Sequence, residues 1–405
     1  MKKFVMYGAG NIGRGFIGQV FSDAGFNVGF VDINKEVIGK LNADKEYPVD
    51  IVSNDGIDER IVKNVYGIDG TDIELVSDEI ASADIMATAI GVNVLKFIAK
   101  PIALGLKKRF EQNKKPFNII ICENLIGADE FLKELIKEQI PEYTERVDNE
   151  IGFVEASIGR MVPVVTEEKK KGNILRVYVE PYNILPVDKD AFKGEIPKVS
   201  NLYPYSPFNL FIQRKLFMHN MSHATCAYLG FLRNYKYIYE TVNDVDIKLV
   251  AYKSLVQSAL AIANENGVEI KDLLSHAENL IYRFKNVELG DTVERVGKDT
   301  IRKLSNNDRL IGAIILAEKH TLPCEYLCIG VAAGMCFAPK DDERSVELSN
   351  YASENGVKAT LNKYCGYNGK MVNLIETLYN KIKASEKLSD IISYVEEVGE
   401  KEIRV

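Results

Sequence analysis

Residues 3–32 read KFVMYGAGNIGRGFIGQVFSDAGFNVGFVD, and this stretch decides the fold of the first half of the chain. The apolar run over residues 3–7 predicts a short buried strand. It is followed at once by three closely spaced glycines, Gly8, Gly10 and Gly13. The next residues have the apolar spacing of a helix, and a second apolar strand then ends at Asp32. This order predicts the first βαβ unit of a parallel sheet.

The glycine spacing and the acid together predict a dinucleotide site. Gly8 permits the tight turn, Gly10 lets the backbone approach a pyrophosphate, and Gly13 lets the helix pack closely on the strand. The pyrophosphate would lie at the helix N-terminus, where free N–H groups favour anions. Asp32 would accept hydrogen bonds from the ribose hydroxyls, which favours NAD over NADP. The predicted cofactor residues of this unit are Gly8, Ala9, Gly10, Asn11, Ile12, Gly13 and Asp32. The alternative is a tight turn in an unrelated α/β domain.

Two more apolar runs predict buried parallel strands, over residues 85–91 and 118–122. Ligands of open α/β sheets collect at the carboxyl ends of the strands. We therefore expect Thr88 and Ala89 to contact the cofactor, and Asn124 to face the reacting centre. The alternative for Asn124 is a helix cap or a turn.

The second half of the chain changes in character after residue 203. Before it, residues 152–165 and 174–180 resemble strands that extend the sheet, and the charged run 167–172 between them predicts the solvated tip of a hairpin. After it, the apolar spacing is helical almost throughout, over residues 207–231, 236–266, 270–284, 299–319, 323–336, 344–363 and 369–398. The predicted architecture is therefore α/β: a Rossmann-type dinucleotide-binding domain with an extended sheet (1–203), followed by a mainly α-helical substrate and catalytic domain (204–405).

The helix predicted over residues 207–231 carries polar groups on an otherwise apolar segment, and burying such groups unpaired is unfavourable. On an α-helix, measured from Lys215, His219 falls at about 40°, His223 at about 80° and Asn220 at about 140°, so all four share one broad face. A buried lysine is a usable general base. Asn220 could hold a substrate oxygen, and His223 could bond a substrate hydroxyl or position the lysine. The alternative is that the histidines are structural, and His219 has no predicted role.

A second cluster places five cations within residues 295–309: Arg295, Lys298, Arg302, Lys303 and Arg309. Such a cluster suits a phosphate or a carboxylate, because Arg binds these groups bidentately. The alternative is a salt-bridged surface helix.

Composition limits the partners of the chain. Its 405 residues carry a formal charge of −7, which argues against nucleic acid or an anionic membrane as a partner. No apolar run approaches the ~18 residues of a membrane span, and the N-terminal one is too short for a signal peptide, so we expect a cytoplasmic protein.

The six cysteines lie mostly in apolar runs, which indicates buried thiols. Cys324-x3-Cys328 near His320 lacks a second ligand pair, so no metal site is predicted.

With these motifs assembled, the chain resembles the polyol-specific long-chain dehydrogenases over most of its length. The shared stretches are residues 8–18, 87–91, 122–124, 214–217, 227–230, 294–297, 302–305 and 308–310. The most specific element is the Lys215-x4-Asn220-x2-His223 pattern. The resemblance implies metal-independent hydride transfer with Lys215 as general base. It also implies an oxyanion site formed by Asn124 and Asn220, with His223 contacting substrate and Arg295 and Lys303 binding the polyol or its phosphate.

The leading hypothesis is interconversion of D-mannitol 1-phosphate and D-fructose 6-phosphate with NAD. Arg214 and the cations of residues 295–309, including Arg302 and Lys303, favour a phosphorylated substrate. The alternatives are a dehydrogenase of a free polyol or a hexonate, and a non-catalytic NAD-binding regulator, which would not need a general base. The chain departs from the family pattern at Gly159, where relatives often carry an acid, and at His219 and Met221, and these departures bear on the identity of the substrate rather than on the reaction type.

Overall fold

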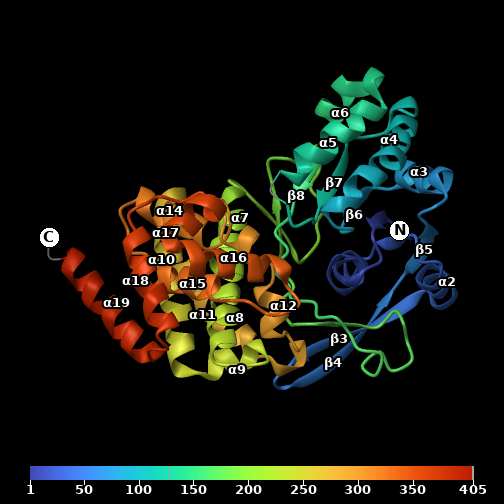
Figure 1. The fold of residues 1–405 in the computed structure, drawn as a ribbon. Coiled ribbons are helices and arrows are strands. Elements are labelled where there is room, and N and C mark those ends of the chain that lie inside the picture. The colour runs from blue at the N-terminus through green and yellow to red at the C-terminus, as the bar shows by residue number, and fades with distance from the viewer. Residues whose placement is uncertain (126, 404–405) are drawn as a thin grey trace. The chain divides into compact units, whose positions relative to one another are not determined.

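The computed structural model describes residues 1–125 and 127–403, with side chains as far as Gly399. It contains two compact units, Met1–Asn209 and Leu210–Val405, and each is described by itself (Figure 1). The boundary predicted after residue 203 falls inside the last strand of the first unit, β11 (Leu202–Tyr205).

Unit 1 is built on a six-stranded sheet in which every neighbouring pair of strands is parallel. The strand order is β5-β2-β1-β6-β7-β8. The strands are β1 (Lys3–Tyr7), β2 (Asn27–Asp32), β5 (Val65–Asp69), β6 (Ile85–Thr88), β7 (Phe117–Ile121) and β8 (Ile151–Glu155). This is the order of a doubly wound dinucleotide-binding sheet, so the predicted α/β fold class is confirmed.

The two faces of the sheet bury different side chains of the same strand, because successive residues of a strand point to opposite faces. Phe4 and Met6 of β1 belong to one core, and Val5 and Tyr7 to the other. The Val5 face is covered by helices, namely α3 (Ile73–Ser82), α4 (Leu95–Glu111), α5 (Ala128–Gln139) and α6 (Thr144–Glu150) (Figure 1).

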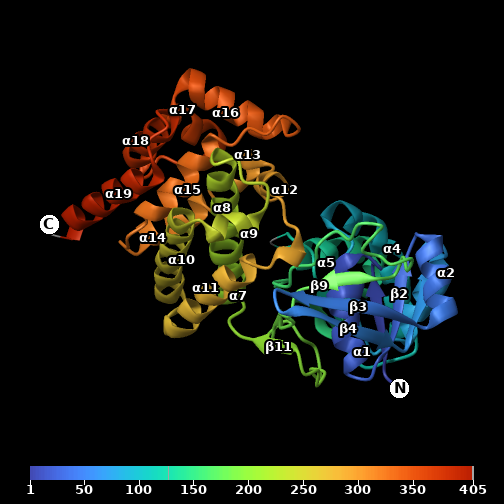
Figure 2. The same cartoon turned by 90° about the horizontal axis from the view of Figure 1, so that it is seen from below.

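The Phe4 face is covered by the helix that follows the glycines and by a second, smaller sheet. This sheet has the order β4-β3-β9, with β3 (Glu46–Ser53), β4 (Gly56–Lys63) and β9 (Val177–Val179) (Figure 2). The predicted hairpin around residues 167–172 is therefore wrong. β9 runs parallel to β3, and β8 stays in the large sheet. The β9 residues are all buried, and the adjacent Arg176 forms a 2.6 Å ion pair with the buried Asp50 of β3, which ties the two strands together.

Unit 2 is helical, as predicted. Its main helices are α8 (Met221–Leu232), α10 (Val245–Asn266), α11 (Lys271–Phe284), α14 (Ile311–Lys319), α15 (Glu325–Met335), α16 (Glu343–Asn355), α18 (Val372–Lys383) and α19 (Leu388–Ile403) (Figure 2). Every residue of α15 is buried, which is typical of a helix in the centre of a core. No helix of the described chain has the length and apolarity that a membrane crossing requires.

Some predicted helices are divided. The segment 236–266 breaks at Asp244, whose side chain accepts hydrogen bonds from the N–H groups of Asp246 and Ile247 and caps α10. The segment 299–319 consists of α13 (Thr300–Lys303) and α14, joined by a polar turn.

Within the described part of the chain, three helices contain π turns, in which the backbone bonds join residue i to residue i+5. They are η1 (Gly13–Gly18), η4 (Arg214–Asn220) and η6 (Leu361–Cys365). The first lies in the predicted cofactor loop. The second carries the predicted catalytic lysine.

Candidate active site

The glycine loop of unit 1 has no room for side chains at two of its three glycines. Gly8 has φ +108°, and a Cβ there would lie 2.6 Å from the Ala89 carbonyl oxygen. A Cβ on Gly13 would lie 2.0 Å from the Gly8 carbonyl oxygen. At Gly10, by contrast, no atom lies within 4 Å of an added Cβ. The open space at Gly10 is where the fingerprint brings a pyrophosphate against the backbone, so the loop fits a dinucleotide.

Asp32, at the end of β2, is hydrogen-bonded to this loop. One carboxylate oxygen accepts from the Ala9 N–H at 2.8 Å, and the other accepts from the Asn34 N–H at 3.0 Å. Each oxygen retains a second lone pair for a ribose hydroxyl. Asn11 and Ile12 open the following helix, whose first N–H groups have no partner within a helix and suit an anion.

The π turn η1 is held by side chains from elsewhere in unit 1. Tyr47 donates its hydroxyl to the Arg14 carbonyl at 2.7 Å, and Arg160 donates to the Gly15 carbonyl at 3.0 Å. The Arg14 side chain in turn donates to the Ala9 carbonyl at 2.7 Å. All three side chains are buried. Side chains that reach into a helix ladder in this way are a known cause of local distortion of the helix.

Thr88 and Ala89 lie beside the loop, at the end of β6. The Ala89 N–H donates to the Tyr7 carbonyl at 2.9 Å, and the Thr88 hydroxyl donates to Glu123 at 2.6 Å. Glu123 also accepts from the Ile90 N–H at 3.1 Å, and burial raises the pKa of its carboxyl. This acid, which sequence reasoning did not single out, joins the carboxyl ends of β6 and β7. Its signal was an acid directly after a buried strand.

Asn124 follows β7 in an exposed loop. Its predicted place at the carboxyl end of the sheet agrees with this position. Its role as an oxyanion ligand stays a prediction.

In unit 2 the predicted catalytic helix runs from Asn209 to Leu232 with the π turn η4 in its middle. The Met221 N–H donates to the Leu216 carbonyl, an i→i+5 bond. The prediction of a uniform α-helix is therefore wrong. Because a π turn needs more residues for each revolution, Asn220 lies nearer to the direction of Lys215 than the 140° estimated for an α-helix.

Lys215, Asn220 and His223 are half-buried, and His219 is buried. The His219 and His223 ring centroids are 6.0 Å apart, and His223 stacks on Phe284 at 4.8 Å and 13°. Burial, reinforced by the positive charge of Arg283, lowers the pKa of His219 well below its usual value. His219 is thus a neutral imidazole in the cluster.

Positively charged side chains also act on His223. Its pKa falls to about 3 through burial and then through Arg295, Lys303, Arg309 and Arg283. The pKa of His276 is lowered in the same way, first by burial and then by the positive charges of Arg214 and Arg283. The cluster is therefore electropositive, and its imidazoles are neutral at pH 7.

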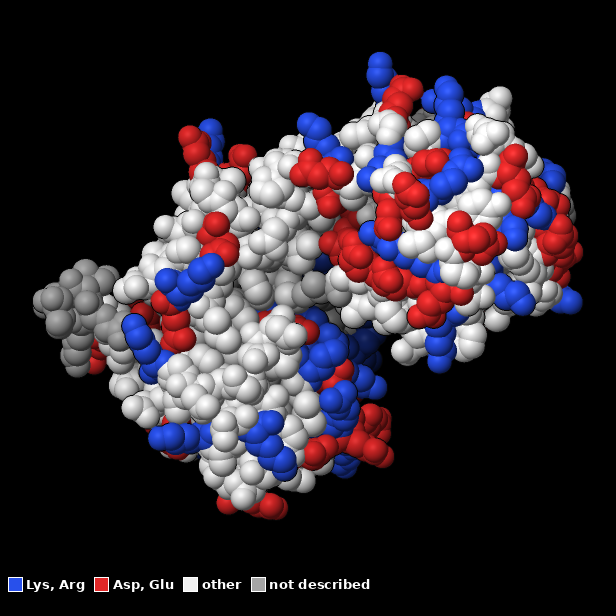
Figure 3. Space-filling model, turned by 90° about the horizontal axis from the view of Figure 1, so that it is seen from above, with Lys and Arg blue, Asp and Glu red and all other residues white. Residues whose placement is uncertain are grey.

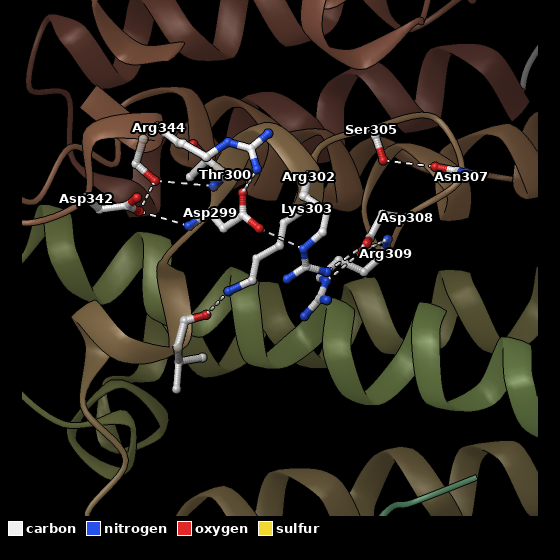
Figure 4. A network of polar contacts seen from close by, with 12 residues as sticks. Asp299, Thr300, Arg302, Lys303, Ser305, Asn307, Asp308, Arg309, Asp342 and Arg344 are labelled. Atoms are coloured by element: carbon white, nitrogen blue, oxygen red, sulfur yellow. Dashed lines mark hydrogen bonds and ion pairs between the residues drawn. The ribbon is translucent and has the colours of Figure 1, made fainter. Parts of the chain in front are cut away.

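The cations of residues 295–309 have different environments (Figure 4). Arg302 is paired with Asp299 at 2.8 Å and with Asp308 at 3.3 Å, and Arg309 is paired with Asp308 at 2.7 Å. For these two arginines the geometry favours the salt-bridged alternative over a phosphate ligand.

Lys303 differs from both arginines. Its side chain is buried and its ammonium donates to the Val296 carbonyl at 2.5 Å (Figure 4). Burial, reinforced by Arg309 and Arg302, lowers its pKa from 10.5 to about 7. Lys303 can therefore gain or lose a proton near neutral pH.

Arg214 and Arg295 are the two remaining predicted substrate ligands. Arg214 places its guanidinium 4.2 Å from the centroid of the Phe211 ring. Arg295 is half-exposed and pairs with Asp291, which also lies 3.5 Å from His223. Sequence reasoning missed Asp291. Its only signal was the turn Gly290-Asp291 before the Glu294-Arg295 motif.

The surface charge is mixed. On the face drawn in Figure 3, acidic and basic side chains are interspersed. The concentration of positive charge around His219 and His223 contrasts with this mixed surface.

Comparison with known proteins places the chain. The model "Mannitol dehydrogenase Rossmann domain" matches residues 2–201, and "Mannitol dehydrogenase C-terminal domain" matches residues 208–392. Mannitol-1-phosphate 5-dehydrogenase of Caldanaerobacter subterraneus subsp. tengcongensis is 34% identical over 391 residues, covering 95% of this chain and 99% of that protein. The protein of the same name from Thermoanaerobacter pseudethanolicus is 36% identical over 391 residues, covering 95% and 98%.

Solved structures share the fold. A D-sorbitol dehydrogenase in substrate-free form superposes with a TM-score of 0.79 at 16% identity, over 94% of this chain and 92% of that one. Pseudomonas fluorescens mannitol 2-dehydrogenase, in a ternary complex with NAD and D-mannitol, superposes with a TM-score of 0.75 at 15% identity, over 98% and 94%. These likenesses agree with the two family models over both units, and the chain belongs to the mannitol dehydrogenase family.

Proposed function

We propose that this chain is an NAD-dependent mannitol-1-phosphate 5-dehydrogenase, which interconverts D-mannitol 1-phosphate and D-fructose 6-phosphate. The observation that carries the proposal is the identity of 34–36% to proteins of that name over nearly the whole length of both chains. The cytoplasm is the proposed location, because the six cysteines are all thiols, as is usual in a reducing compartment.

Unit 1 holds the cofactor in this proposal. The peptide from Ala9 to Gly13 receives the pyrophosphate, Asp32 binds the ribose, and Thr88 and Ala89 border the site. A carboxylate at Asp32 favours NAD, because a 2′-phosphate would meet its negative charge. Bound NAD supplies the acceptor for the hydride that leaves the carbinol carbon.

Unit 2 supplies the proton chemistry. In the oxidation direction Lys215, as a free amine, accepts the proton of the reacting hydroxyl and returns it in reduction. The amides of Asn220 and Asn124 donate hydrogen bonds to the oxygen as it gains negative charge. His223, which is neutral, bonds a neighbouring hydroxyl of the substrate.

The electropositive cluster supports a phosphorylated substrate. Cations converge on both His223 and His276. We assign the phosphate to Lys303 and Arg214, because their charges act on His223 and His276 respectively, and place Arg295 at the rim. A phosphate dianion beside Lys303 would raise its lowered pKa, so binding of the sugar phosphate at pH 7–8 should be accompanied by proton uptake.

The second candidate is a dehydrogenase of a free polyol or a hexonate. The pairing of Arg295 with Asp291 favours it, because that carboxylate offsets one of the cations.

Turnover assays separate the candidates. NADH oxidation is followed with fructose 6-phosphate, fructose and a ketohexonate in parallel, and NADPH is tested with each. Turnover with fructose 6-phosphate and NADH, at least ten-fold more efficient than with fructose, is the expected result. Turnover with fructose alone would overturn the proposal, and no turnover with any substrate would favour a non-catalytic regulator.

A further inference from the structure

A carboxylate lies between two of the proposed substrate ligands. One oxygen of Asp291 is 3.5 Å from His223 Nε2, and the other accepts a hydrogen bond from the Arg295 guanidinium. The Asp291 side chain is only 11% exposed. Its own backbone carbonyl accepts from the Ile238 N–H at 2.9 Å, so the residue is anchored at the start of α9 (Ile238–Asn243).

The His223 ring has little freedom beside this carboxylate. Its plane is set by stacking on Phe284, at 4.8 Å and 13°. Its Nε2 is buried and has no hydrogen-bond partner among the described residues, and the recorded charged neighbour of this atom is the Asp291 carboxylate at 3.5 Å. Since the pKa of His223 is lowered to about 3, the ring is neutral and the contact is not an ion pair at pH 7. A neutral ring beside a carboxylate is expected to carry its proton on the facing nitrogen, as Nε2–H.

We propose that Asp291 is a positioning residue that fixes His223 as the Nε2–H tautomer and holds Arg295 beside it. The tautomer leaves Nδ1 as a hydrogen-bond acceptor, and a substrate hydroxyl is a donor that suits it. One carboxylate thus sets the direction of the His223 hydrogen bond and the place of Arg295 together. This inference rests on the proposed role of His223 in binding substrate.

The tautomer can be measured without substrate. The full-length protein is labelled with 15N-histidine, and the long-range 15N–1H spectrum distinguishes Nε2–H from Nδ1–H rings. The chain has only four histidines, so His223→Gln assigns the signal. We expect His223 to be Nε2–H in the wild type. In Asp291→Asn the amide NH2 can donate to Nε2, and the ring should shift toward Nδ1–H. An Nδ1–H ring in the wild type would overturn the proposal.

Kinetics test the consequence for binding. Asp291→Asn should raise the KM of the sugar substrate about ten-fold, the equivalent of one lost hydrogen bond, and leave the KM of NADH within two-fold. Asp291→Glu keeps the carboxylate and should recover most of the loss. Glu294→Gln, an exposed acid on the same segment, is the matched control and should change neither constant.

The outcomes are distinct. An unchanged sugar KM in Asp291→Asn would overturn the proposal, as would equal rises in both KM values with a lower Tm, which indicate a structural role. If Asp291→Asn does not fold, the wild-type tautomer still decides. The wild type is first assayed with fructose 6-phosphate, fructose and a ketohexonate. Failure with the phosphate overturns only the proposed substrate, and the Asp291 comparison is then made with the sugar that is turned over.

Discussion

The π turns η1 and η4 are alike in backbone and differ in what holds them. In η1, two carbonyls receive donors from distant residues, Tyr47 and Arg160. In η4, the hydroxyl of Ser222 reaches back within the same helix to the Met218 carbonyl at 2.7 Å. The first turn shapes a surface made of backbone. The second aims side chains, among them Lys215 and Asn220. A site for a common cofactor can be built from peptide groups, whereas a site for one reaction needs particular side chains.

The largest effect is expected on kcat, when the proposed general base Lys215 is removed from η4. Lys215→Ala should lower kcat at least ~100-fold, the lower end of what a general base contributes. NADH affinity, measured by fluorescence titration, should stay nearly unchanged. Lys319→Ala, at an exposed ion pair with Glu265 in the same unit, is the control. More than about a tenth of wild-type turnover in Lys215→Ala would remove the lysine from the mechanism.

The cofactor loop should respond in binding instead. At Gly10 a Cβ has open space in the protein but would meet the pyrophosphate. Crowding of this kind costs about 1–3 kcal/mol, so the Kd for NADH should rise about ten-fold in Gly10→Ala while Tm is unchanged. Gly39→Ala also has open space, in α2 (Lys35–Asp44) away from the loop, and should leave the Kd unaltered. Equal Kd values for both variants would contradict the loop's assignment.

The support that η1 receives from Tyr47 can be tested by removing the hydroxyl of that side chain. Tyr47→Phe leaves the Arg14 carbonyl without its donor, and an orphaned buried acceptor costs about 1–3 kcal/mol. Thermal unfolding should therefore begin at a lower temperature, by roughly 2–4 °C for each kcal/mol. Tyr282→Phe removes a hydroxyl from an exposed tyrosine and should not shift the transition. An unshifted Tm in Tyr47→Phe would mean that the π turn does not depend on the hydrogen bond from Tyr47.

The smallest effect is expected at the local support of η4. Ser222→Ala loses its bond to the Met218 carbonyl, but that bond bends helices rather than stabilising them, and alanine has the higher helix propensity. The free energy of unfolding should change by less than about 0.5 kcal/mol. A loss comparable to that of Tyr47→Phe would abolish the contrast between the two turns.

The sequence was most informative where the backbone itself carries the signal. Gly8 and Gly13 can be recognised because a Cβ would collide with backbone oxygens at both positions. The π turns could not be recognised, since no residue pattern in η1 or η4 distinguishes an i→i+5 bond from the i→i+4 bond of an α-helix. The hairpin prediction failed because β9 pairs with β3, which lies more than a hundred residues earlier in the chain. The alternation of apolar and polar side chains predicts a strand but does not identify the strand with which it pairs.

The site was predictable only in part for the same reason. Lys215, Asn220 and His223 lie within one helix, so their common face can be predicted from their spacing in the sequence. Asp291 and Glu123 contact groups that are distant in sequence, 68 and 35 residues away for His223 and Thr88, and their local signals, a turn and a strand end, do not identify these partners. The pairing of Arg302 and Arg309 with acids likewise became evident only from their geometry.

The bond between Asp32 and the Ala9 N–H has a consequence for the kinetics of cofactor exchange. With Arg14 on the Ala9 carbonyl and Asp32 on the Ala9 N–H, the two peptide groups that flank the Ala9 Cα are both held. Little backbone entropy remains to be lost when a dinucleotide arrives, so the association rate should be set by diffusion rather than by ordering of the loop. Differences in affinity among nucleotides should then appear mainly in how fast each one leaves.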